Sequence, residues 1–395
     1  MGTPVCVVSN AYPDFEGSYH GIFVRRIAED MAAKGYFSHL VVPWIFTEST
    51  PSELYPTHSV SRFRFPSAQK LLIEYEGLPI FRFSLLAAGG TLAALRTIRR
   101  SGCRLVHAHW AAPAGLIALA AARLKNLPLV VTVHGSDYRL AAERGGVFSL
   151  AFNRVVTAAD RVISVSGEIT EYLVTRAHLE EKSVVTCPMG ADERIFNMHA
   201  GEESLFDHGF TVISTRNHFP HYRVTDLLEA AVPAKQKIPG LRLAILGQGP
   251  GTAELKDRAR SLGIGENEVV FPGRVEPGRL ASLLAAARIY VSTSPVEGTS
   301  ASLLEAMACG VLPVVTDIPS NRSWITDGEN GLLFPPADVG ALAEALTRAA
   351  EDEDLQNRAR IRGPATVAER GGLWSKQIDT LAAVYGELIP GKPAD

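Results

Sequence analysis

Two carboxylates, Glu297 and Glu305, are separated by seven residues in a segment that could bind a phosphorylated ligand. An apolar run ends at Ser292 and a helical pattern begins near Ser300, so the loop between them leads into a helix. Helix N-termini present unpaired backbone N–H groups and a positive dipole end, which suit a diphosphate. A structural alternative for Glu305 stays open, because Ser302 and Glu305 also form a Ser-x-x-Glu capping box.

Three further polar residues follow predicted strands, at the edge where open α/β sheets bind ligands. Arg216 follows the strand Thr211–Ser214, and its guanidinium could bind phosphate through two hydrogen bonds. Arg223 lies in the same loop, either as a phosphate ligand or as a solvated charge. His134 follows the strand Leu129–Val133, a place where a lone histidine is more often structural than catalytic.

Two more histidines, His107 and His109, end the preceding strand at alternate positions, so their side chains share one face of the sheet. No carboxylate or cysteine accompanies them at the spacing of metal ligands, and no Asp-x-Asp motif follows a strand. We therefore predict no metal site and interpret these histidines as structural or as bordering an acceptor. The incomplete pattern Gly247-x-Gly249-x-x-Thr252 weakens the case for a dinucleotide oxidoreductase.

Composition excludes several classes of protein. The formal net charge of the 395-residue chain is −3, so the chain lacks the basic field of a nucleic-acid binder. The four cysteines form no Cys-x-x-Cys pair, which argues against a zinc site or a disulfide framework and fits a reducing cytoplasm. Residues 1–10 do not have the pattern of a signal peptide, and the longest apolar stretch, near 111–122, is too short to span a bilayer. We therefore predict a cytoplasmic protein.

Short apolar runs alternate with helical patterns in two series, and this alternation predicts parallel sheets covered by helices on both faces. In the first series the predicted strands are Val5–Val8, Leu40–Val42, Leu105–Ala108, Leu129–Val133 and Arg161–Val165, and the predicted helices are 21–34 and 114–125. In the second series the predicted strands are Thr211–Ser214, Leu241–Leu246, Val269–Phe271, Ile289–Ser292 and Leu312–Val315, and the predicted helices are 225–237, 253–262, 280–287 and 302–309.

The two series predict the α/β fold class, with two doubly wound, Rossmann-like domains. The length also suggests two domains, at roughly 100–200 residues each. A polar break near 195–208 gives an N-terminal domain over 1–198 and a C-terminal domain over 199–372. A last helix, within 373–395, either crosses back to cover the first domain or stays on the second.

The segment 292–310 resembles the Glu-x7-Glu signature of the retaining glycosyltransferase family 4, whose fold is called GT-B. The matching residues are Ser292 or Ser294, Glu297, Gly298, Glu305, Ala306, Met307, Ala308 and Gly310. Weaker similarities extend over most of the chain, whereas residues 40–100 match poorly. The resemblance implies two Rossmann-like domains that face each other across a cleft, with the acceptor on the first domain, the donor on the second and the last helix packed back on the first.

The resemblance also implies roles for individual residues. The catalytic candidates are His134, Arg216 and Glu297. The donor-binding candidates are Gly17, Gly21, Arg216, Arg223, Gly247, Arg274, Glu297, Gly298, Thr299, Ser300 and Glu305. By this resemblance Glu297 approaches the donor sugar and Glu305 the ribose of the nucleotide, whose hydroxyl groups carboxylates can bind. The sequence departs from the family where a lysine usually assists the arginine, because Tyr222 occupies that position and Arg223 follows it.

The function implied by the resemblance is retaining, metal-independent transfer of a hexosyl-type sugar from a nucleotide diphosphate sugar, UDP- or GDP-linked, without a cofactor. The acceptor is expected to be a glycan, a lipid-linked sugar or a small molecule, in polysaccharide or glycolipid biosynthesis. Two alternatives remain on the same fold: a sugar-nucleotide epimerase and a non-catalytic sugar-nucleotide binder. A phosphorylase is disfavoured, because no motif marks a pyridoxal-binding lysine.

Basic and apolar residues gather between residues 60 and 104. Eight lysines and arginines stand against two acids there, interleaved with aromatic and aliphatic residues, in a chain whose net charge is −3. Such a stretch can dock on an anionic membrane surface, so a peripheral contact with the inner face of the membrane is one interpretation. The structural alternative is an ordinary pair of helices with solvated arginines and an apolar core face.

Overall fold

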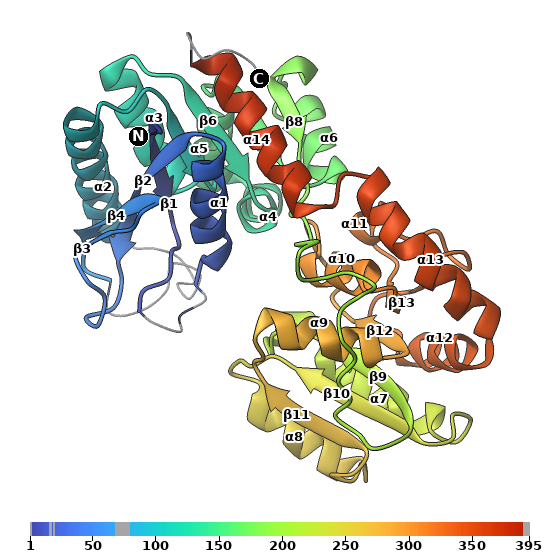
Figure 1. Ribbon diagram of the computed structural model, residues 1–395. Helices are drawn as coiled ribbons and strands as arrows, with labels where there is room; N and C mark the ends of the chain where they lie inside the picture. The colour runs from blue at the N-terminus through green and yellow to red at the C-terminus, as the bar shows by residue number, and fades with distance from the viewer. Residues whose placement is uncertain (1, 16–17, 19, 68–79, 390–395) are drawn as a thin grey trace. The chain divides into compact units, whose positions relative to one another are not determined.

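The computed structural model describes residues 2–15, 18, 20–67 and 80–389, which form two compact units (Figure 1). One unit consists of Met1–Cys187 with Ile378–Asp395, and the other of Pro188–Gln377. The division at 187/188 falls before the predicted boundary at 198/199. The reason is a backbone pairing between Ala191 and Leu373, which ties the start of this connection to the second unit.

In the first unit, β1 (Thr3–Ser9) lies between β2 (Tyr36–Trp44) and β5 (Val106–His109) and is parallel to both. Among the described residues the strand order is β3-β4-β2-β1-β5-β6-β7-β8, with β3 and β4 antiparallel and the other pairs parallel. The remaining strands are β3 (Ser52–Leu54), β4 (His58–Arg64), β6 (Leu129–Val133), β7 (Arg161–Ser164) and β8 (Val184–Thr186). The helices are α1 (Ile22–Ala33), α2 (Ile80–Ser101), α3 (Ala114–Lys125), α4 (Gly135–Arg144), α5 (Gly146–Val156), α6 (Gly167–Thr175) and most of α14 (Trp374–Leu388).

In the second unit, β9 (Phe210–Ser214) lies between β10 (Leu241–Leu246) and β12 (Ile289–Ser292). Within the described residues the order is β11-β10-β9-β12-β13-β14 and every pair is parallel. The other elements are β11 (Val269–Gly273), β13 (Leu312–Thr316), β14 (Leu332–Phe334), α7 (Val224–Ala234), α8 (Thr252–Ser261), α9 (Pro277–Ala286), α10 (Ala301–Ala308), α11 (Pro319–Arg322), α12 (Val339–Glu351) and α13 (Glu353–Glu369). Strand order reverses beside β9, as it does beside β1, so the carboxyl ends of β9 and β12 form a topological switch point.

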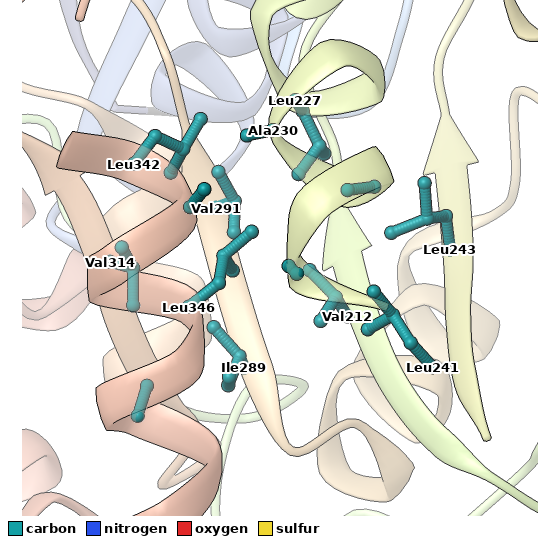
Figure 2. Packing of buried hydrophobic residues seen from close by; sticks show 14 of the residues in the cluster. Val212, Leu227, Ala230, Leu241, Leu243, Ile289, Val291, Val314, Leu342 and Leu346 are labelled. Atoms are coloured by element: carbon teal, nitrogen blue, oxygen red, sulfur yellow. The ribbon is translucent and has the colours of Figure 1, made fainter. Parts of the chain in front are cut away.

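Apolar residues cover both faces of the second sheet, because successive side chains of a strand point to opposite faces. Val212 of β9 belongs to the cluster under α7 and α12, which Figure 2 shows with Leu227 and Leu346 of those helices. The next residue, Ile213, belongs to the opposite cluster, with Leu303 of α10. Burial on both faces is why the strands of this sheet are apolar runs without a polar alternation.

The last helix, α14, joins the two units, and from Ile378 onwards it belongs to the first. Its Asp379 pairs with Lys34 at 2.6 Å, and the carbonyl of Ala382 accepts a hydrogen bond from the Tyr36 hydroxyl (3.3 Å). The described part of the basic stretch 60–104 contains the end of β4 and the helix α2. The alternative of a helical pair falls partly outside the described residues and stays open. Residues 58–64 form a strand because they pair along β2, and residues 68–79 lie outside the described chain.

Candidate active site

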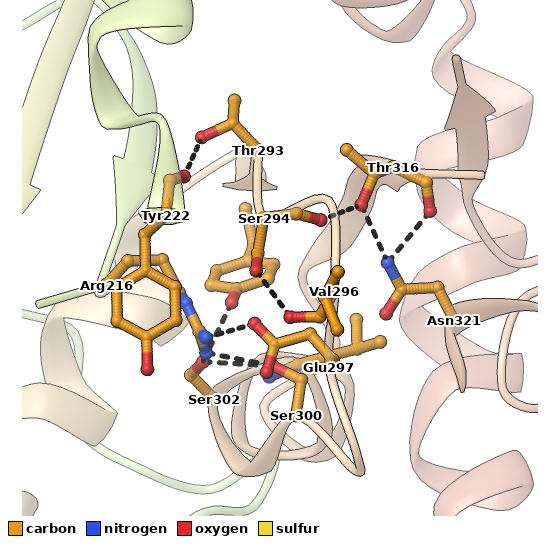
Figure 3. Close-up of polar contacts among 12 residues, drawn as sticks. Arg216, Tyr222, Thr293, Ser294, Val296, Glu297, Ser300, Ser302, Thr316 and Asn321 are labelled. Carbon is orange, nitrogen blue, oxygen red and sulfur yellow. Dashed lines mark hydrogen bonds and ion pairs between the residues drawn. The ribbon is translucent and has the colours of Figure 1, made fainter. Parts of the chain in front are cut away.

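Arg216 and Glu297 follow β9 and β12, whose carboxyl ends meet at the switch point of the second sheet. The Arg216 guanidinium lies between the two loops (Figure 3). Its Nη1 donates to Ser300 Oγ (3.1 Å) and Ser302 Oγ (2.9 Å), and its Nη2 forms an ion pair with Glu297. The side chains of Arg216 and Glu297 are only 10% and 11% exposed. The structure therefore brings three of the predicted residues together, with Ser302 as an addition.

The start of α10 agrees with a helix that begins near Ser300 and differs from the alternative in which Ser302 caps it. Ser300 is the N-cap residue, and its hydroxyl accepts a hydrogen bond from the backbone N–H of Leu303 (3.4 Å). Ser302 lies inside the first turn, so the capping box of Ser302 and Glu305 is wrong: the helix starts two residues earlier than that box requires. Glu305 is half-buried in the second turn and is not part of the cap.

The guanidinium of Arg216 is held from its face as well as from its edges. Its Cζ lies 4.3 Å from the centroid of the Tyr222 ring, within the range of a cation–π contact. Burial on its own lowers the pKa of Arg216, but the Glu297 carboxylate and the hydroxyls of Tyr290 and Tyr222 more than offset this and raise it. The arginine is therefore a fixed positive charge in a buried place.

Four buried polar atoms around this edge have no hydrogen-bond partner within the described part of the chain. They are Arg216 Nε, Thr215 Oγ1, Ser292 Oγ and His218 Nε2. Buried polar groups are nearly always satisfied, so such a group of atoms indicates a place for a polar ligand. The sequence did not single out His218, whose Nδ1 lies 2.8 Å from Thr252 Oγ1; its place two residues after Arg216 was the one available signal.

Gly247 supports Arg216 through the backbone. It has a φ of +101°, and a Cβ there would lie 2.5 Å from the backbone oxygen of Arg216. Gly249 is equally tight, because its Cβ would lie 2.6 Å from the backbone oxygen of His218. The loop after β10 thus packs directly on the loop after β9, which a side chain at either glycine would prevent.

The other donor-binding candidates are spread along the same edge of the sheet. Gly298 and Thr299 are half-buried just before α10, and Arg274 is exposed after the edge strand β11. Arg223 is the N-cap residue of α7, in the left-handed conformation (φ 52°), and its Nε donates to Asp226 Oδ2 at 2.8 Å. Arg223 is therefore paired within its own helix turn.

His134 lies at the matching edge of the first sheet, directly after β6, as the N-cap residue of α4. It is buried, its Nε2 lies 3.2 Å from His109 Nδ1, and the rings of Phe23 and Trp110 pack against it. Burial, with a smaller contribution from His109, lowers the pKa of His134 well below its ordinary value. The imidazole is therefore neutral near pH 7.

Two neighbours of His134 have clear structural roles. His107 is bonded at both ring nitrogens, by the Tyr385 hydroxyl at Nδ1 (2.7 Å) and by Thr132 Oγ1 at Nε2 (2.8 Å), which supports the structural interpretation. Asp137 was not predicted; it is buried, it accepts a hydrogen bond from the backbone N–H of Ala111 (2.7 Å), and burial raises its pKa to about 7.

The glycine-containing loop after β1 is described in part. Gly21 has a φ of +68°, and a Cβ there would lie 2.5 Å from the backbone of Ala11, so this close return of the loop needs glycine. Gly17 lies outside the described residues. Within the described residues, no group of three or more histidine, cysteine, aspartate or glutamate side chains is placed to hold a metal ion.

Two family models match the chain one after the other. Residues 20–194 match the model described as Glycosyltransferase Family 4, and residues 200–366 match the model described as Glycosyl transferases group 1. The matched ranges include His134 in the first unit and Arg216, Glu297 and Glu305 in the second. The chain belongs to glycosyltransferase family 4. It is a glycosyltransferase in which a buried arginine–glutamate pair lies at the switch point of the second sheet.

Named relatives of this glycosyltransferase have different products. The N-acetyl-alpha-D-glucosaminyl L-malate synthase of Bacillus anthracis is 22% identical over 372 residues, which are 91% of each chain. The phosphatidyl-myo-inositol mannosyltransferase of Mycobacterium tuberculosis is 30% identical over 216 residues, or 53% of this chain and 55% of that one.

Solved glycosyltransferase structures have the same GT-B fold, with two Rossmann-like domains. Sucrose-phosphate synthase from Thermosynechococcus elongatus matches with a TM-score of 0.77 and 20% identity, over 98% of this chain and 99% of that one. HepE from Anabaena, solved in complex with UDP, matches with a TM-score of 0.71 and 18% identity, over 98% of this chain and 100% of that one. At these identities the likeness concerns the fold.

Proposed function

We propose that this glycosyltransferase moves a hexosyl-type sugar from a nucleotide diphosphate sugar, with retention of configuration and without a metal ion. The observation that carries the proposal is the buried guanidinium of Arg216 at the switch point, beside the N-terminus of α10. A fixed cation next to a helix N-terminus can stabilise the negative charge that develops on a leaving diphosphate. The bond from sugar C1 to the phosphate oxygen breaks with its electrons on the diphosphate, the acceptor hydroxyl oxygen bonds to C1, and the hydroxyl proton passes to the leaving phosphate oxygen.

The other candidates receive roles from their chemistry. Glu297 and Glu305 are proposed to accept hydrogen bonds from hydroxyl groups of the donor, Glu297 at the sugar and Glu305 at the ribose. The backbone around Gly298 and Thr299 precedes a helix N-terminus and suits the diphosphate. On the first unit, the neutral imidazole of His134 is the catalytic candidate, as a hydrogen-bonding group and not as a charge.

A screen of UDP-, GDP- and ADP-sugars by thermal shift identifies the donor, because a ligand that binds the folded protein raises its melting temperature. Transfer is then followed as release of the nucleoside diphosphate with and without EDTA, and NMR of the product reports the anomeric configuration. We expect release to survive EDTA and the configuration to be retained. Loss of activity with EDTA, with rescue by Mg²⁺ or Mn²⁺, overturns the metal-independent mechanism, and an inverted product overturns retention.

Substitution of Glu305 tests the donor site directly. Glu305→Ala is expected to weaken donor binding by about tenfold or more, because a hydrogen bond to a charged group contributes about 1.5–3 kcal/mol. Unchanged donor affinity contradicts the assignment. Conversion of the donor sugar to its epimer without an acceptor identifies an epimerase, and binding without any turnover identifies a sugar-nucleotide binder.

We further propose an anionic or lipid-linked acceptor and a peripheral membrane contact through α2, as the phosphatidyl-myo-inositol relative suggests. The exposed residues of α2 include large apolar side chains followed by basic ones: Phe81, Leu85, Leu92, Arg96, Arg99 and Arg100. Their spacing places them along one side of the helix. None of the described helices is long and apolar enough to cross a membrane.

Vesicles of phosphatidylcholine with and without phosphatidylglycerol test this contact by co-sedimentation at low and high salt. We expect binding to the anionic vesicles that weakens with salt, because each basic residue near such a surface contributes about 1 kcal/mol. A triple reversal, Arg96→Glu, Arg99→Glu and Arg100→Glu, is expected to abolish it. Absence of binding at low salt, or binding that ignores both salt and the reversal, rules out the membrane contact and leaves a soluble anionic acceptor.

A further inference from the structure

The buried cation of the proposed donor site already has a counterion within the protein. Arg216 and Glu297 form an ion pair in which both side chains are about nine-tenths buried, and Figure 3 shows the carboxylate at the edge of the guanidinium. Removing one partner of a buried pair leaves the other charge uncompensated, which is strongly unfavourable. A diphosphate that approaches Arg216 therefore has to compete with Glu297.

The hydrogen bonds of Arg216 show where this competition takes place. Nη1 is occupied by Ser300 Oγ and Ser302 Oγ at 3.1 and 2.9 Å. Nε is buried and has no partner among the described residues, and Nη2 is bonded to Glu297. The Nε–Nη2 edge, which can bind an oxyanion through two parallel hydrogen bonds, thus combines one unsatisfied donor with one donor held by a carboxylate.

We propose that Glu297 is the resident counterion of Arg216 and that the donor's diphosphate displaces it from the Nε–Nη2 edge, which releases the Glu297 carboxylate to the hydroxyls of the donor sugar. This inference rests on the proposed donor function. The exchange keeps the charge of Arg216 compensated before and after donor binding. A nucleoside diphosphate without a sugar displaces Glu297 but offers it no hydroxyls in return, so the same pair favours release of the product.

Tyr222 keeps the guanidinium in place while its counterion changes. The Tyr222 ring lies against the face of Arg216 at 4.3 Å, and the Tyr222 carbonyl accepts a hydrogen bond from Thr293 Oγ1 (2.9 Å), beyond the end of β12. Figure 3 shows Tyr222 beside Arg216, with its carbonyl bonded to Thr293. The contact with the Tyr222 ring and the hydrogen bonds of Nη1 remain when the Nε–Nη2 edge exchanges Glu297 for the diphosphate. Tyr222, which stands where the family usually has a lysine, is therefore a positioning residue.

Calorimetric titration of the full chain with UDP, GDP and ADP tests the exchange in Glu297→Gln. Glutamine keeps the shape of the side chain and an acceptor for Nη2 but carries no charge. We expect the nucleoside diphosphate to bind about tenfold more tightly to Glu297→Gln than to the wild type, because the competing charge is gone. Transfer from the sugar nucleotide is expected to fall by about tenfold or more, because the sugar hydroxyls lose a charged acceptor.

Asp317→Asn is the matched control. Asp317 follows β13 at the same edge of the sheet and is paired with Arg322, whose Nη2 lies 2.8 Å from its Oδ2. This substitution removes one negative charge from the same edge without touching Arg216, and we expect nucleotide affinity to change by less than about twofold. A gain in Asp317→Asn equal to that in Glu297→Gln overturns the proposal, because the effect would then come from net charge.

The outcomes separate this inference from the proposed function. Unchanged or weaker nucleotide binding in Glu297→Gln overturns the exchange while the donor function stands. If none of UDP, GDP and ADP binds the wild type, the donor function fails and the exchange fails with it. Melting temperatures give a second measurement: Glu297→Gln is expected to melt lower than the wild type without nucleotide and to show the larger upward shift with it, and equal shifts count against the proposal.

Substitutions of Tyr222 test the positioning role in the same titrations. Tyr222→Phe keeps the ring and is expected to hold nucleotide affinity within about twofold, whereas Tyr222→Leu is expected to weaken it about threefold to tenfold, in line with a desolvated cation–π contact. Equal affinities in the two variants rule out a contribution from the ring face.

Discussion

In the first sheet the strand order around the switch point is β4-β2-β1-β5-β6-β7, and in the second it is β11-β10-β9-β12-β13-β14, so both reverse beside their first strand. The edges differ in chemistry. The first presents the neutral imidazoles of His109 and His134, packed among aromatic rings, and the second presents the charged pair of Arg216 and Glu297.

The difference shows that strand order decides where ligands can bind and that individual residues decide which ligands. Burial lowers the pKa of His109 to about 3, so the first edge carries no imidazolium at neutral pH. At the second edge the Glu297 carboxylate keeps a buried guanidinium charged, because each charge compensates the other. A diphosphate is therefore expected at the second edge, and uncharged hydroxyl groups of the substrates at the first.

Of the variants proposed, Arg216→Ala is expected to change nucleotide affinity and stability most, and it tests the contrast between the two edges. Nucleoside diphosphate affinity is expected to fall by about a hundredfold, since one charged hydrogen bond contributes about 1.5–3 kcal/mol and the buried Glu297 then repels the ligand. The free energy of unfolding is expected to fall by about 3–5 kcal/mol, because Glu297 loses its counterion. The matched variant, His134→Ala, is expected to lower transfer and leave nucleotide affinity unchanged. Calorimetry and chemical denaturation measure both quantities, and equal affinities in the two variants contradict the contrast between the edges.

Acidification is expected to weaken the first unit before the second. The pKa values of His107, His109 and His134 lie below their ordinary value in the folded chain, so unfolding takes up protons as the pH falls below about 6.5. The pKa of Asp137 is raised to about 7, which acts in the opposite direction between about pH 4 and 7 and offsets one of the three protons.

Burial lowers the pKa values of His39 and His58 of the first unit as well, whereas His218 has a lowered pKa in the second unit. More of these histidines lie in the first unit, so it is expected to lose more stability than the second below about pH 6. Amide hydrogen exchange at pH 7.5 and pH 5.5 measures this unit by unit. We expect protection in β5 and β6 to fall more than protection in β9 and β12, after correction for intrinsic exchange. An equal loss in both sheets contradicts the prediction.

Two tyrosine variants, one in each unit, test the same contrast with smaller expected changes in stability and affinity. Tyr385→Phe removes the hydroxyl that bonds His107 Nδ1, and we expect a loss of about 1–3 kcal/mol in the stability of the first unit with nucleotide affinity unchanged. Tyr290→Phe removes a hydroxyl that donates to Ser302 Oγ at 3.0 Å, and we expect it to weaken nucleotide binding by a factor of about three. Denaturation measures the stability of both variants and calorimetry their nucleotide affinity. A loss of nucleotide affinity in Tyr385→Phe equal to that in Tyr290→Phe contradicts the comparison.

The smallest expected effect belongs to Arg223→Gln. Arg223 is 39% exposed and paired with Asp226 in the first turn of α7, and such a surface pair contributes about 0.3–0.5 kcal/mol. Nucleotide affinity is expected to change by less than about threefold. A loss of tenfold or more shows instead that Arg223 leaves Asp226 to bind the diphosphate, in which case the second edge holds two cations.

Much of this fold could be predicted from the sequence, because a buried parallel strand is an apolar run and can be recognised without knowing which strands lie beside it. The predicted strands at β9, β10 and β12 agree with the structure within a residue at each end. The short strands β3, β8 and β14 were missed, since each has three residues and depends on pairing with a neighbour. Length and periodicity carry no signal for such elements.

The candidate site was predictable in its residues and not in its contacts. The Glu-x7-Glu motif located Glu297 and Ser300, and the end of a predicted strand located Arg216. The ion pair and the bond to Ser302 join residues more than 80 positions apart, so the motif alone could not predict them. The capping box was wrong because two serines could cap the same helix, and the structure uses Ser300. The pairing of Ala191 with Leu373, which joins the start of the connection to the second unit, also links positions far apart along the chain.

The path of α14 has a consequence for the order in which this protein is completed on the ribosome. Domains generally fold as they are synthesised, N-terminal first. Here the Tyr385 hydroxyl that bonds His107 is made after all 190 residues of Pro188–Gln377, about 10–40 s later at about 5–20 residues per second. The unit that leaves the ribosome first is therefore finished last, and the surface that receives α14, including Tyr36, stays exposed to water throughout that interval.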